Sequence, residues 1–183
     1  MRLVALVASI AFALPAHAAG KFLLTSADVK AGATLTDQQV FNGFGCSGAN
    51  VSPQLAWENA PAGTRSFVVT VYDPDAPTGS GWWHWVVYNI PATAKELAQG
   101  AGSNKAPLPE GAVQGRTDFG APGFGGACPP VGDKPHHYVF TVYALKVEKL
   151  EAAADASPAL IGFMTRANSL GSATFTARYG RKK

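Results

Sequence analysis

Two apolar segments, residues 66–72 and 86–90, are joined by a stretch far longer than a hairpin turn needs. The first segment is apolar at both odd and even positions, which is typical of a central strand covered on both faces. The connection, residues 73–85, carries two X-Pro bonds, glycines, two carboxylates and a histidine among three tryptophans. Short hairpin loops use about two to five residues, and longer ordered loops commonly carry function. The pattern therefore predicts two buried strands with a site where they are joined.

Most of the remaining chain is also typical of strands. β-Branched and aromatic residues favour strands at residues 21–24, 84–90, 137–146 and 172–179. Residues 99–133 are rich in Gly and Pro, but apolar residues punctuate them, so we expect an ordered surface excursion within one domain. The predicted fold class is mostly β (a β-rich α+β fold), with a single domain spanning residues 19–183.

One helix is predicted over residues 158–170. Ser157 is placed as the N-cap, and Pro158 occupies the first helical position, where its missing N–H costs nothing. Gly171 is expected to end the helix. Apolar residues recur at helical spacing and predict a packing face: Leu160, Ile161, Met164, Ala167 and Leu170.

The first 18 residues have the three parts of a cleavable signal peptide. Arg2 is a positive start, residues 3–14 are an apolar run too short to span a bilayer, and Ala16-His17-Ala18 is an A-x-A cleavage signal. A buried N-terminal strand or a retained anchor is the alternative. We expect export and a periplasmic or secreted protein.

The charge of the chain does not indicate binding to nucleic acid. The formal net charge is +3, and the basic cluster Arg178, Arg181, Lys182 and Lys183 has the pattern of an exposed tail. Because no aromatic residues interleave with these cations, no nucleic-acid partner is expected. No later segment is apolar enough to cross a membrane.

The two cysteines, Cys46 and Cys128, predict a disulfide. An even cysteine count in an exported chain favours pairing, and this bridge would close a long loop. The chain-entropy model gives such a loop a stabilisation of about 4 to 5 kcal/mol. Two reduced thiols are the alternative, and a metal pair is disfavoured because no C-x-x-C spacing is present.

A polar site is predicted from residues at strand ends. His136 and Tyr138 share one face of their strand, and His84 enters its strand from the loop that Asp73 begins. Asp73 can accept a histidine N–H, and Tyr138 can donate its O–H. Backbone N–H groups in residues 125–128 could add an anion-binding nest. The expected ligand is a phosphate or carboxylate.

Other interpretations of these residues remain open. The histidines can be structural, or two histidines and an aspartate can hold a divalent ion, although no H-x-H spacing supports a metal. The tryptophans at 82, 83 and 85 can wall a pocket, cap the core or meet a membrane interface. Gly43 to Gly48 matches G-x-G-x-x-G, and Asp118-Phe119-Gly120 matches a kinase metal triplet, but both lack the required context.

Two paired motifs resemble the signatures of the phosphatidylethanolamine-binding protein (PEBP) family. Asp73-Pro74-Asp75-Ala76-Pro77 is similar to the D-P-D-x-P signature, and Trp83-His84 stands where the family has its pocket histidine. Pro129-Pro130 followed by His136-x-Tyr138 is similar to the second signature. The resemblance runs from about residue 21 to residue 183 and is strongest to the exported, bacterial YbhB/YbcL type of Raf kinase inhibitor-like proteins.

The resemblance implies a large antiparallel sheet packed on a smaller one, with peripheral helices. It also implies a cavity near a sheet edge for a phosphate-like head group, and a cis peptide in the first signature, here at Ala76–Pro77. Cys128 stands where eukaryotic members often have glycine, and His137 where many have arginine. The ligand-binding set that we expect is Asp73, Pro74, Pro77, His84, Gly126, Ala127, Cys128, Pro129, His136 and Tyr138.

The expected function is non-enzymatic binding of a small anion or a phospholipid head group, without a cofactor or metal. A protein-interaction or inhibitor role is the first alternative, and the sequence is compatible with a homodimer. An exported hydrolase that uses the His/Asp pocket is a further alternative, although no G-x-S-x-G nucleophile elbow is present.

Overall fold

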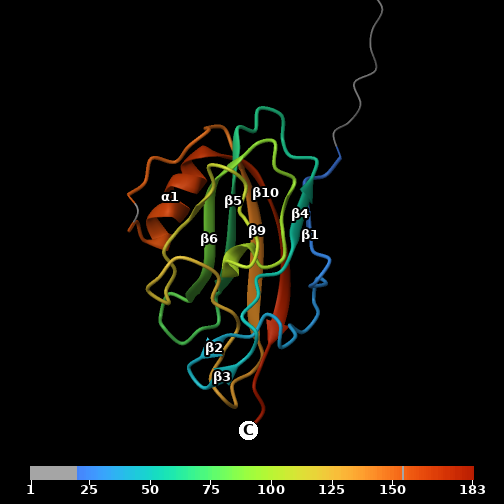
Figure 1. Cartoon of the computed structure of the whole chain (residues 1–183), viewed down its shortest axis with the longest axis vertical. Helices are drawn as coiled ribbons and strands as arrows, with labels where there is room; N and C mark the ends of the chain where they lie inside the picture. The colour runs from blue at the N-terminus through green and yellow to red at the C-terminus, as the bar shows by residue number, and fades with distance from the viewer. Residues whose placement is uncertain (1–19, 154) are drawn as a thin grey trace, which may run out of the picture.

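The computed structural model describes residues 20–153 and 155–183, and the predicted signal peptide lies outside them (Figure 1). The predicted mostly β class is confirmed. The largest sheet is antiparallel and has the strand order β10-β9-β5-β6-β8. Its strands are β5 (Ser66–Asp73), β6 (Trp82–Pro91), β8 (Val113–Gln114), β9 (His136–Leu145) and β10 (Ser169–Tyr179).

A smaller antiparallel sheet, in the order β1-β4-β7, and a hairpin complete the β structure. The elements are β1 (Leu23–Thr25), β4 (Leu55–Glu58), β7 (Glu96–Leu97), and the hairpin β2 (Asn42–Gly43) with β3 (Cys46–Ser47). A 3₁₀ turn, η1, spans Ala101–Ser103, and the helix α1 spans Pro158–Asn168. In Figure 1, α1 and the small sheet flank the large sheet, and the hairpin lies near the C-terminus.

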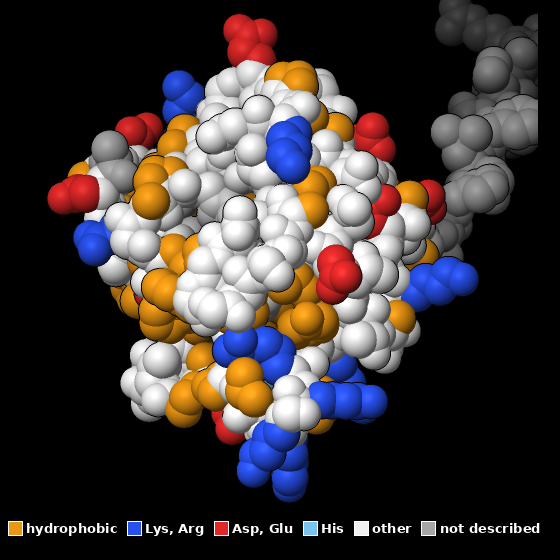
Figure 2. All heavy atoms as spheres, turned by 60° about the horizontal axis from the view of Figure 1, so that its bottom comes forward, with side chains coloured by type: hydrophobic (Ala, Val, Ile, Leu, Met, Phe, Trp, Pro, Cys, Tyr) orange, Lys and Arg blue, Asp and Glu red, His pale blue; other side chains and the backbone are white. Residues whose placement is uncertain are grey.

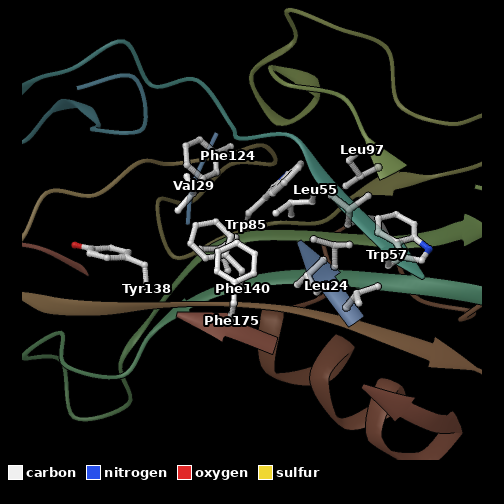
Figure 3. Packing of buried hydrophobic residues seen from close by; sticks show 14 of the residues in the cluster. Leu24, Val29, Leu55, Trp57, Trp85, Leu97, Phe124, Tyr138, Phe140 and Phe175 are labelled. Atoms are coloured by element: carbon white, nitrogen blue, oxygen red, sulfur yellow. The ribbon is translucent and has the colours of Figure 1, made fainter. Parts of the chain in front are cut away.

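The large sheet is buried on both faces at its centre. Seven of the eight residues of β5 are buried, as expected from its apolar pattern on both parities. One apolar cluster fills the space between the two sheets, where Trp57 and Phe67 pack with ring centroids 5.2 Å apart. A second cluster, which includes Val68 and Ile161, lies under α1. Figure 3 shows Tyr138 at one end of the first cluster, which places the end of β9 beside the core.

The helix begins as predicted but ends early. The Ser157 side chain accepts a hydrogen bond from the backbone N–H of Leu160, and Pro158 follows it. The helix stops at Asn168 because the chain passes directly into β10 at Ser169, without a glycine cap. The predicted apolar face is also wrong in part, since Leu160 and Leu170 are 46% and 40% exposed and Ile161 carries the packing.

Of two predictions about the loops, one is confirmed and one is wrong. Residues 99–133 are ordered as expected, and Phe124 and Ala127 from this segment are buried in the core. The expectation of a cis bond at Ala76–Pro77 is wrong, because all peptide bonds in the described part of the chain are trans.

Within residues 20–153 and 155–183, no helix has the length and apolar character needed to span a bilayer.

Candidate functional site

A pocket of about 150 Å³ opens where the ends of β5, β6 and β9 meet. It collects side chains from three distant parts of the chain, as the sequence predicted for Asp73, His84, His136 and Tyr138. These four side chains are all buried. The full lining is Phe44, Asp73, Ala76, Pro77, Thr78, Trp82, His84, Phe119, Cys128, Pro129, Pro130, His136 and Tyr138.

Asp73 orients His136 rather than His84. Nδ1 of His136 lies 2.7 Å from Oδ2 of Asp73, and the other carboxylate oxygen accepts the backbone N–H of Asp75 at 2.8 Å. Because a carboxylate can only accept, Nδ1 carries the hydrogen and Nε2 is left for a ligand. The nearest carboxylate to Nε2 is that of Asp133, at 3.6 Å, which is longer than a normal hydrogen bond.

His84 is turned into the pocket by an irregularity in its strand. Trp85 and Trp83 pair with consecutive residues of β5, so His84 is the extra residue of a β-bulge, a device that re-aims a side chain. Its Nδ1 lies 2.7 Å from the carbonyl oxygen of Gly125. Nδ1 therefore donates, and Nε2 is again the remaining ring nitrogen. Burial lowers the pKa of His84, so the neutral ring is favoured.

Tyr138 contributes a buried hydroxyl without a partner. Its Oη has no hydrogen-bond partner among the described residues, although most buried polar atoms have one. Burial, and next the charge of Asp73, raise the pKa of Tyr138, so the hydroxyl stays protonated. The backbone N–H of Cys128 acts in the opposite direction and lowers the pKa, but burial outweighs it. An unmatched donor on a residue that lines a pocket indicates a place for a ligand atom.

The expected anion nest in residues 125–128 is largely occupied by internal bonds. Gly125 N–H donates to the carbonyl of His84 at 2.9 Å, and Ala127 N–H donates to that of Gln39 at 3.0 Å. Gly126 N–H donates to Oδ1 of Asn50 at 2.7 Å. Contrary to the prediction, Gly126 and Ala127 do not line the pocket and cannot offer these donors to an anion. Their bonds instead hold the pocket wall in place.

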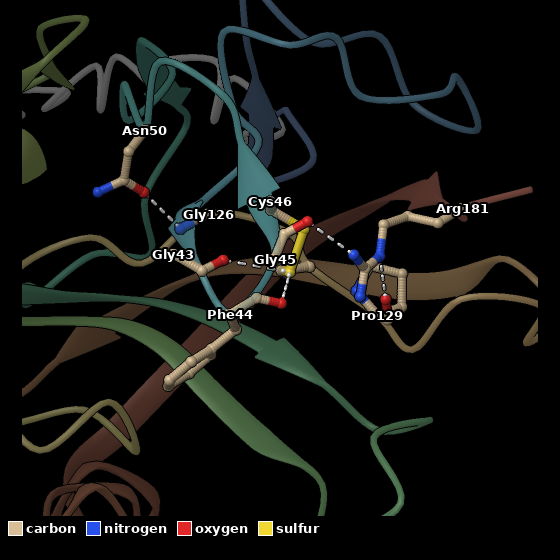
Figure 4. Close-up of a disulfide and its surroundings, with 9 residues drawn as sticks. Gly43, Phe44, Gly45, Cys46, Asn50, Gly126, Pro129 and Arg181 are labelled. Atoms are coloured by element: carbon tan, nitrogen blue, oxygen red, sulfur yellow. Dashed lines mark hydrogen bonds between the residues drawn. A yellow bond between two sulfur atoms is a disulfide. The ribbon is translucent and has the colours of Figure 1, made fainter.

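The predicted pair Cys46–Cys128 forms a disulfide that joins the β2–β3 hairpin to the pocket wall (Figure 4). The two Cα atoms are 6.0 Å apart and the residues are separated by 82 positions in sequence. Arg181 adds a second fastening, because its guanidinium donates to the carbonyls of Pro129 at 2.6 Å and Gly45 at 3.0 Å. Arg181 is therefore built into the site's support and is not merely part of an exposed tail.

An aromatic rim surrounds the polar floor, and the sequence did not indicate most of it. Phe119 packs against Phe41 with centroids 4.5 Å apart, stacks on Phe44 at 5.8 Å, and meets Trp82 edge to face at 5.4 Å. The same ring lies 5.4 Å from His84. Phe44 belongs to the rejected G-x-G-x-x-G match and Phe119 to the rejected kinase triplet. Spacing alone gave no reason to place either beside His84.

Asp118 explains how Phe119 reaches the pocket. Its carboxylate accepts the backbone N–H of Trp83 at 2.7 Å, and its own N–H donates to the carbonyl of Trp83 at 3.1 Å. The loop is thus fastened to β6 immediately beside His84. The three tryptophans divide between environments: Trp82 lines the pocket, Trp83 packs against Tyr72 on the other face, and Trp85 is in the core.

A second Asp–His pair lies outside the pocket. Oδ2 of Asp75 accepts from both the backbone N–H and Nδ1 of His137, each at 2.7 Å. Burial alone would raise the pKa of Asp75, but these bonds and the nearby histidines hold the pKa below its usual value. His137 and Asp75 are about 40% exposed, so the pair tethers the Pro loop to β9. Pro74 of the expected set also lies outside the pocket lining.

Comparison with known proteins gives the family. The model of the family described as phosphatidylethanolamine-binding protein matches residues 25–180. The chain belongs to this family. The match contains both signature segments and every pocket residue, so the pocket of this PEBP-family chain lies entirely inside the matched region.

Relatives support the bacterial type of PEBP. The chain is 56% identical to the UPF0098 protein YbcL of Escherichia coli over 93% of both chains, and 53% identical to YbhB of the same organism over 85% of this chain and 98% of YbhB. The crystal structure of E. coli YbcL matches with a TM-score of 0.85 at 57% identity, covering 88% of this chain and 99% of YbcL. A PEBP homologue, CT736 of Chlamydia trachomatis, matches at TM-score 0.73 and 29% identity, covering 87% and 97%.

The side chains of the pocket do not form a metal-binding cluster in the described part of the chain. In the described part of the chain, no group of three or more His, Cys, Asp or Glu side chains is arranged to hold a metal ion. Nδ1 of each pocket histidine is already bonded, to Gly125 for His84 and to Asp73 for His136. The arrangement therefore favours hydrogen bonding to a ligand through the two Nε2 atoms and the Tyr138 hydroxyl.

Proposed function

We propose that this PEBP-family protein is a non-enzymatic binding protein whose pocket captures a small anion or a phosphate-bearing head group. The observation that carries the proposal is the unpartnered, buried hydroxyl of Tyr138, in a pocket that it shares with two histidines whose Nδ1 atoms are already used. His84, His136 and Tyr138 all line one pocket of about 150 Å³, a space suited to one small polar group.

The hydrogen-bonding roles favour a partly protonated phosphate over a fully ionised one. Tyr138 donates, whereas neutral His84 presents an Nε2 lone pair that accepts. A phosphate monoester has a second pKa near 6, so its monoanion carries a P–OH that can donate to Nε2. Alternatively, a histidine takes up a proton as the anion binds, and its second N–H then donates a charge-assisted bond. Both routes predict weaker binding above about pH 7.

The same groups are poorly equipped for covalent catalysis. Tyr138 remains protonated because burial raises its pKa, and the sulfur of Cys128 is held in the disulfide. A nucleophile is activated by a lowered pKa or by an adjacent base. The pKa of Tyr138 is raised rather than lowered, and the sulfur of Cys128 cannot ionise while it is in the disulfide. These features support a binding role over hydrolysis. Turnover of phosphate esters that is lost in His84→Ala would contradict the non-enzymatic part of the proposal.

We also propose that the protein works in the periplasm or outside the cell. The signal-like residues 1–18 and the Cys46–Cys128 disulfide both support export, since such bonds persist in oxidising compartments. Fractionation of cells that express the full chain tests this. A protein recovered in the cytosol with residues 1–18 attached would contradict it.

Calorimetric titration with phosphoethanolamine tests the binding role. Tyr138→Phe removes one hydroxyl and should weaken binding about tenfold, the effect of a hydrogen bond to a charged ligand. The double change His84→Ala/His136→Ala should abolish measurable binding. The matched control is His137→Ala, which removes a histidine next to the pocket and should leave affinity unchanged. Equal affinity in all four proteins would refute the proposal.

A further inference from the structure

The hairpin turn beside the pocket presents an aromatic ring to solvent. Phe44 is 70% exposed, and it occupies the first of two central positions in the β2–β3 turn. Both central residues have positive φ, 52° for Phe44 and 77° for Gly45, as in a type I′ turn. That conformation favours Asn, Asp or Gly and is unfavourable for phenylalanine. A strained backbone that holds a large ring in water points to a role in recognition.

This turn is fixed rather than loose. Cys46, two residues after Phe44, is bonded to Cys128, and the Gly45 carbonyl accepts a hydrogen bond from Arg181. The ring of Phe44 also stacks on Phe119. The position of the exposed ring relative to the pocket is therefore set by a covalent bond and by two non-covalent contacts.

A second apolar residue and several lysines surround the same end of the molecule. Val131, which follows the pocket residues Pro129 and Pro130, is 55% exposed and bridges to Arg181. Lys134, Lys182 and Lys183 are exposed, and Lys183 lies against Gly132. Asp133 is the carboxylate of this segment. Figure 2, which brings the hairpin end forward, shows Lys and Arg side chains gathered around hydrophobic ones there.

We propose that this surface, made of Phe44, Val131, Lys134, Lys182 and Lys183, docks on an anionic phospholipid bilayer with the pocket mouth facing the lipid. Single exposed apolar side chains among long lysines suit an interface in which apolar groups enter the headgroup boundary and cations meet lipid phosphates. A protein partner is less favoured, because lysines are depleted in protein–protein interfaces and three of these five residues are lysines. This docking goes beyond the proposed function, because it concerns the surface around the pocket mouth, where Phe44 lines the pocket and the other four residues lie outside the lining.

Co-sedimentation with vesicles tests the docking surface. The wild-type protein should bind vesicles of phosphatidylglycerol mixed with phosphatidylcholine, should bind pure phosphatidylcholine vesicles more weakly, and should be released as ionic strength rises. Phe44→Asn should weaken binding about tenfold, the effect of losing one buried phenylalanine side chain. Because Asn suits the turn, this variant should fold at least as well as wild type.

The chain offers a matched control in Phe163, which is 71% exposed on α1. Phe163→Asn removes a ring of equal exposure from another element and should leave vesicle binding within twofold of wild type. Absence of binding to anionic vesicles at low ionic strength would overturn the inference. Equal losses in Phe44→Asn and Phe163→Asn would overturn it as well.

Discussion

Asp73 and His136 form a buried pair, with Oδ2 and Nδ1 2.7 Å apart, that joins the pocket ends of β5 and β9. Neither strand pairs with the other at these two residues, since their ladder ends at Tyr72 and Val139. The side-chain bond therefore continues the connection beyond the last backbone pair. The other carboxylate oxygen of Asp73, Oδ1, accepts a hydrogen bond from the backbone N–H of Asp75 at the start of the Pro loop.

Replacing Asp73 with alanine should lower the free energy of unfolding by about 3 kcal/mol, because it leaves the buried His136 and the Asp75 N–H without partners. Chemical denaturation measures the effect. Asp75→Ala is the matched control, since it removes the carboxylate of a half-exposed pair with the same bond length and should cost less than about 1 kcal/mol. Equal costs would mean that burial of the Asp73 pair has no energetic consequence.

Stability should fall as the pH falls below about 6.5, the ordinary value for His84. The pKa of His84 is lowered in the folded state, so as the pH falls the unfolded chain takes up a proton at this residue before the folded protein does. This proton uptake favours the unfolded chain and lowers the free energy of unfolding. The loss begins near the unfolded pKa and continues down to the folded one. Unfolding measured at several pH values between about 7 and 5 should show it.

His84→Gln should flatten this pH dependence, because glutamine does not titrate. Tyr138→Phe, which changes the same pocket but removes a group that stays protonated throughout this range, should retain it. A pH dependence that is identical in wild type and His84→Gln would show that another group is responsible.

The disulfide should contribute about 4 to 5 kcal/mol to stability, because it closes a loop across 82 residues of separation. Denaturation of Cys46→Ser/Cys128→Ser, or of the reduced protein, measures this contribution. Reduction should also release the Phe44 turn and weaken its contact with Phe119. A stability change below about 1 kcal/mol would mean that the unfolded chain is already constrained in this region.

Gly126 should not tolerate a side chain. A Cβ at this position would lie 2.2 Å from the Gln39 carbonyl oxygen and 2.7 Å from the Phe41 nitrogen, so the backbone itself would have to move. Gly126→Ala should destabilise the protein by about 2 kcal/mol or more. Gly162→Ala on α1, where the nearest atom is 4.0 Å away, should instead stabilise it by about 0.5 to 1 kcal/mol. Thermal unfolding of the two variants should shift in opposite directions.

Sequence patterns predicted those elements whose own residues specify them. β5, β6 and β9 are eight to ten residues long and rich in β-branched and aromatic side chains, so their composition was sufficient. The two-residue strands, such as β7 and β8, are too short to show a period and form only because a longer neighbour supplies the partner. The end of α1 was misplaced because Leu170 belongs to β10, where Ser169 and Gly171 on either side of it pair with β9, a tertiary effect that overrides the helical spacing.

The sequence predicted that the four polar residues of the pocket lie together, but it did not predict which hydrogen bonds they form. The strand ends indicated that Asp73, His84 and His136 meet, yet which histidine the carboxylate would orient depended on the β-bulge at His84. The same bulge brings Gly125 to that ring. Phe44 and Phe119 reach the rim through the disulfide and through Asp118, contacts between segments distant in the chain. No local pattern encodes such contacts.

The most direct test of head-group capture is to observe the histidine nitrogens while phosphate is added. Two-dimensional nuclear magnetic resonance of the imidazole ¹⁵N nuclei distinguishes Nδ1 from Nε2 in each ring. We expect the Nε2 signals of His84 and His136 to shift in a saturable manner with phosphate, whereas the signals of both nitrogens of His137 stay in place. Unchanged signals from His84 and His136 at saturating phosphate, or a shift confined to His137, would contradict it.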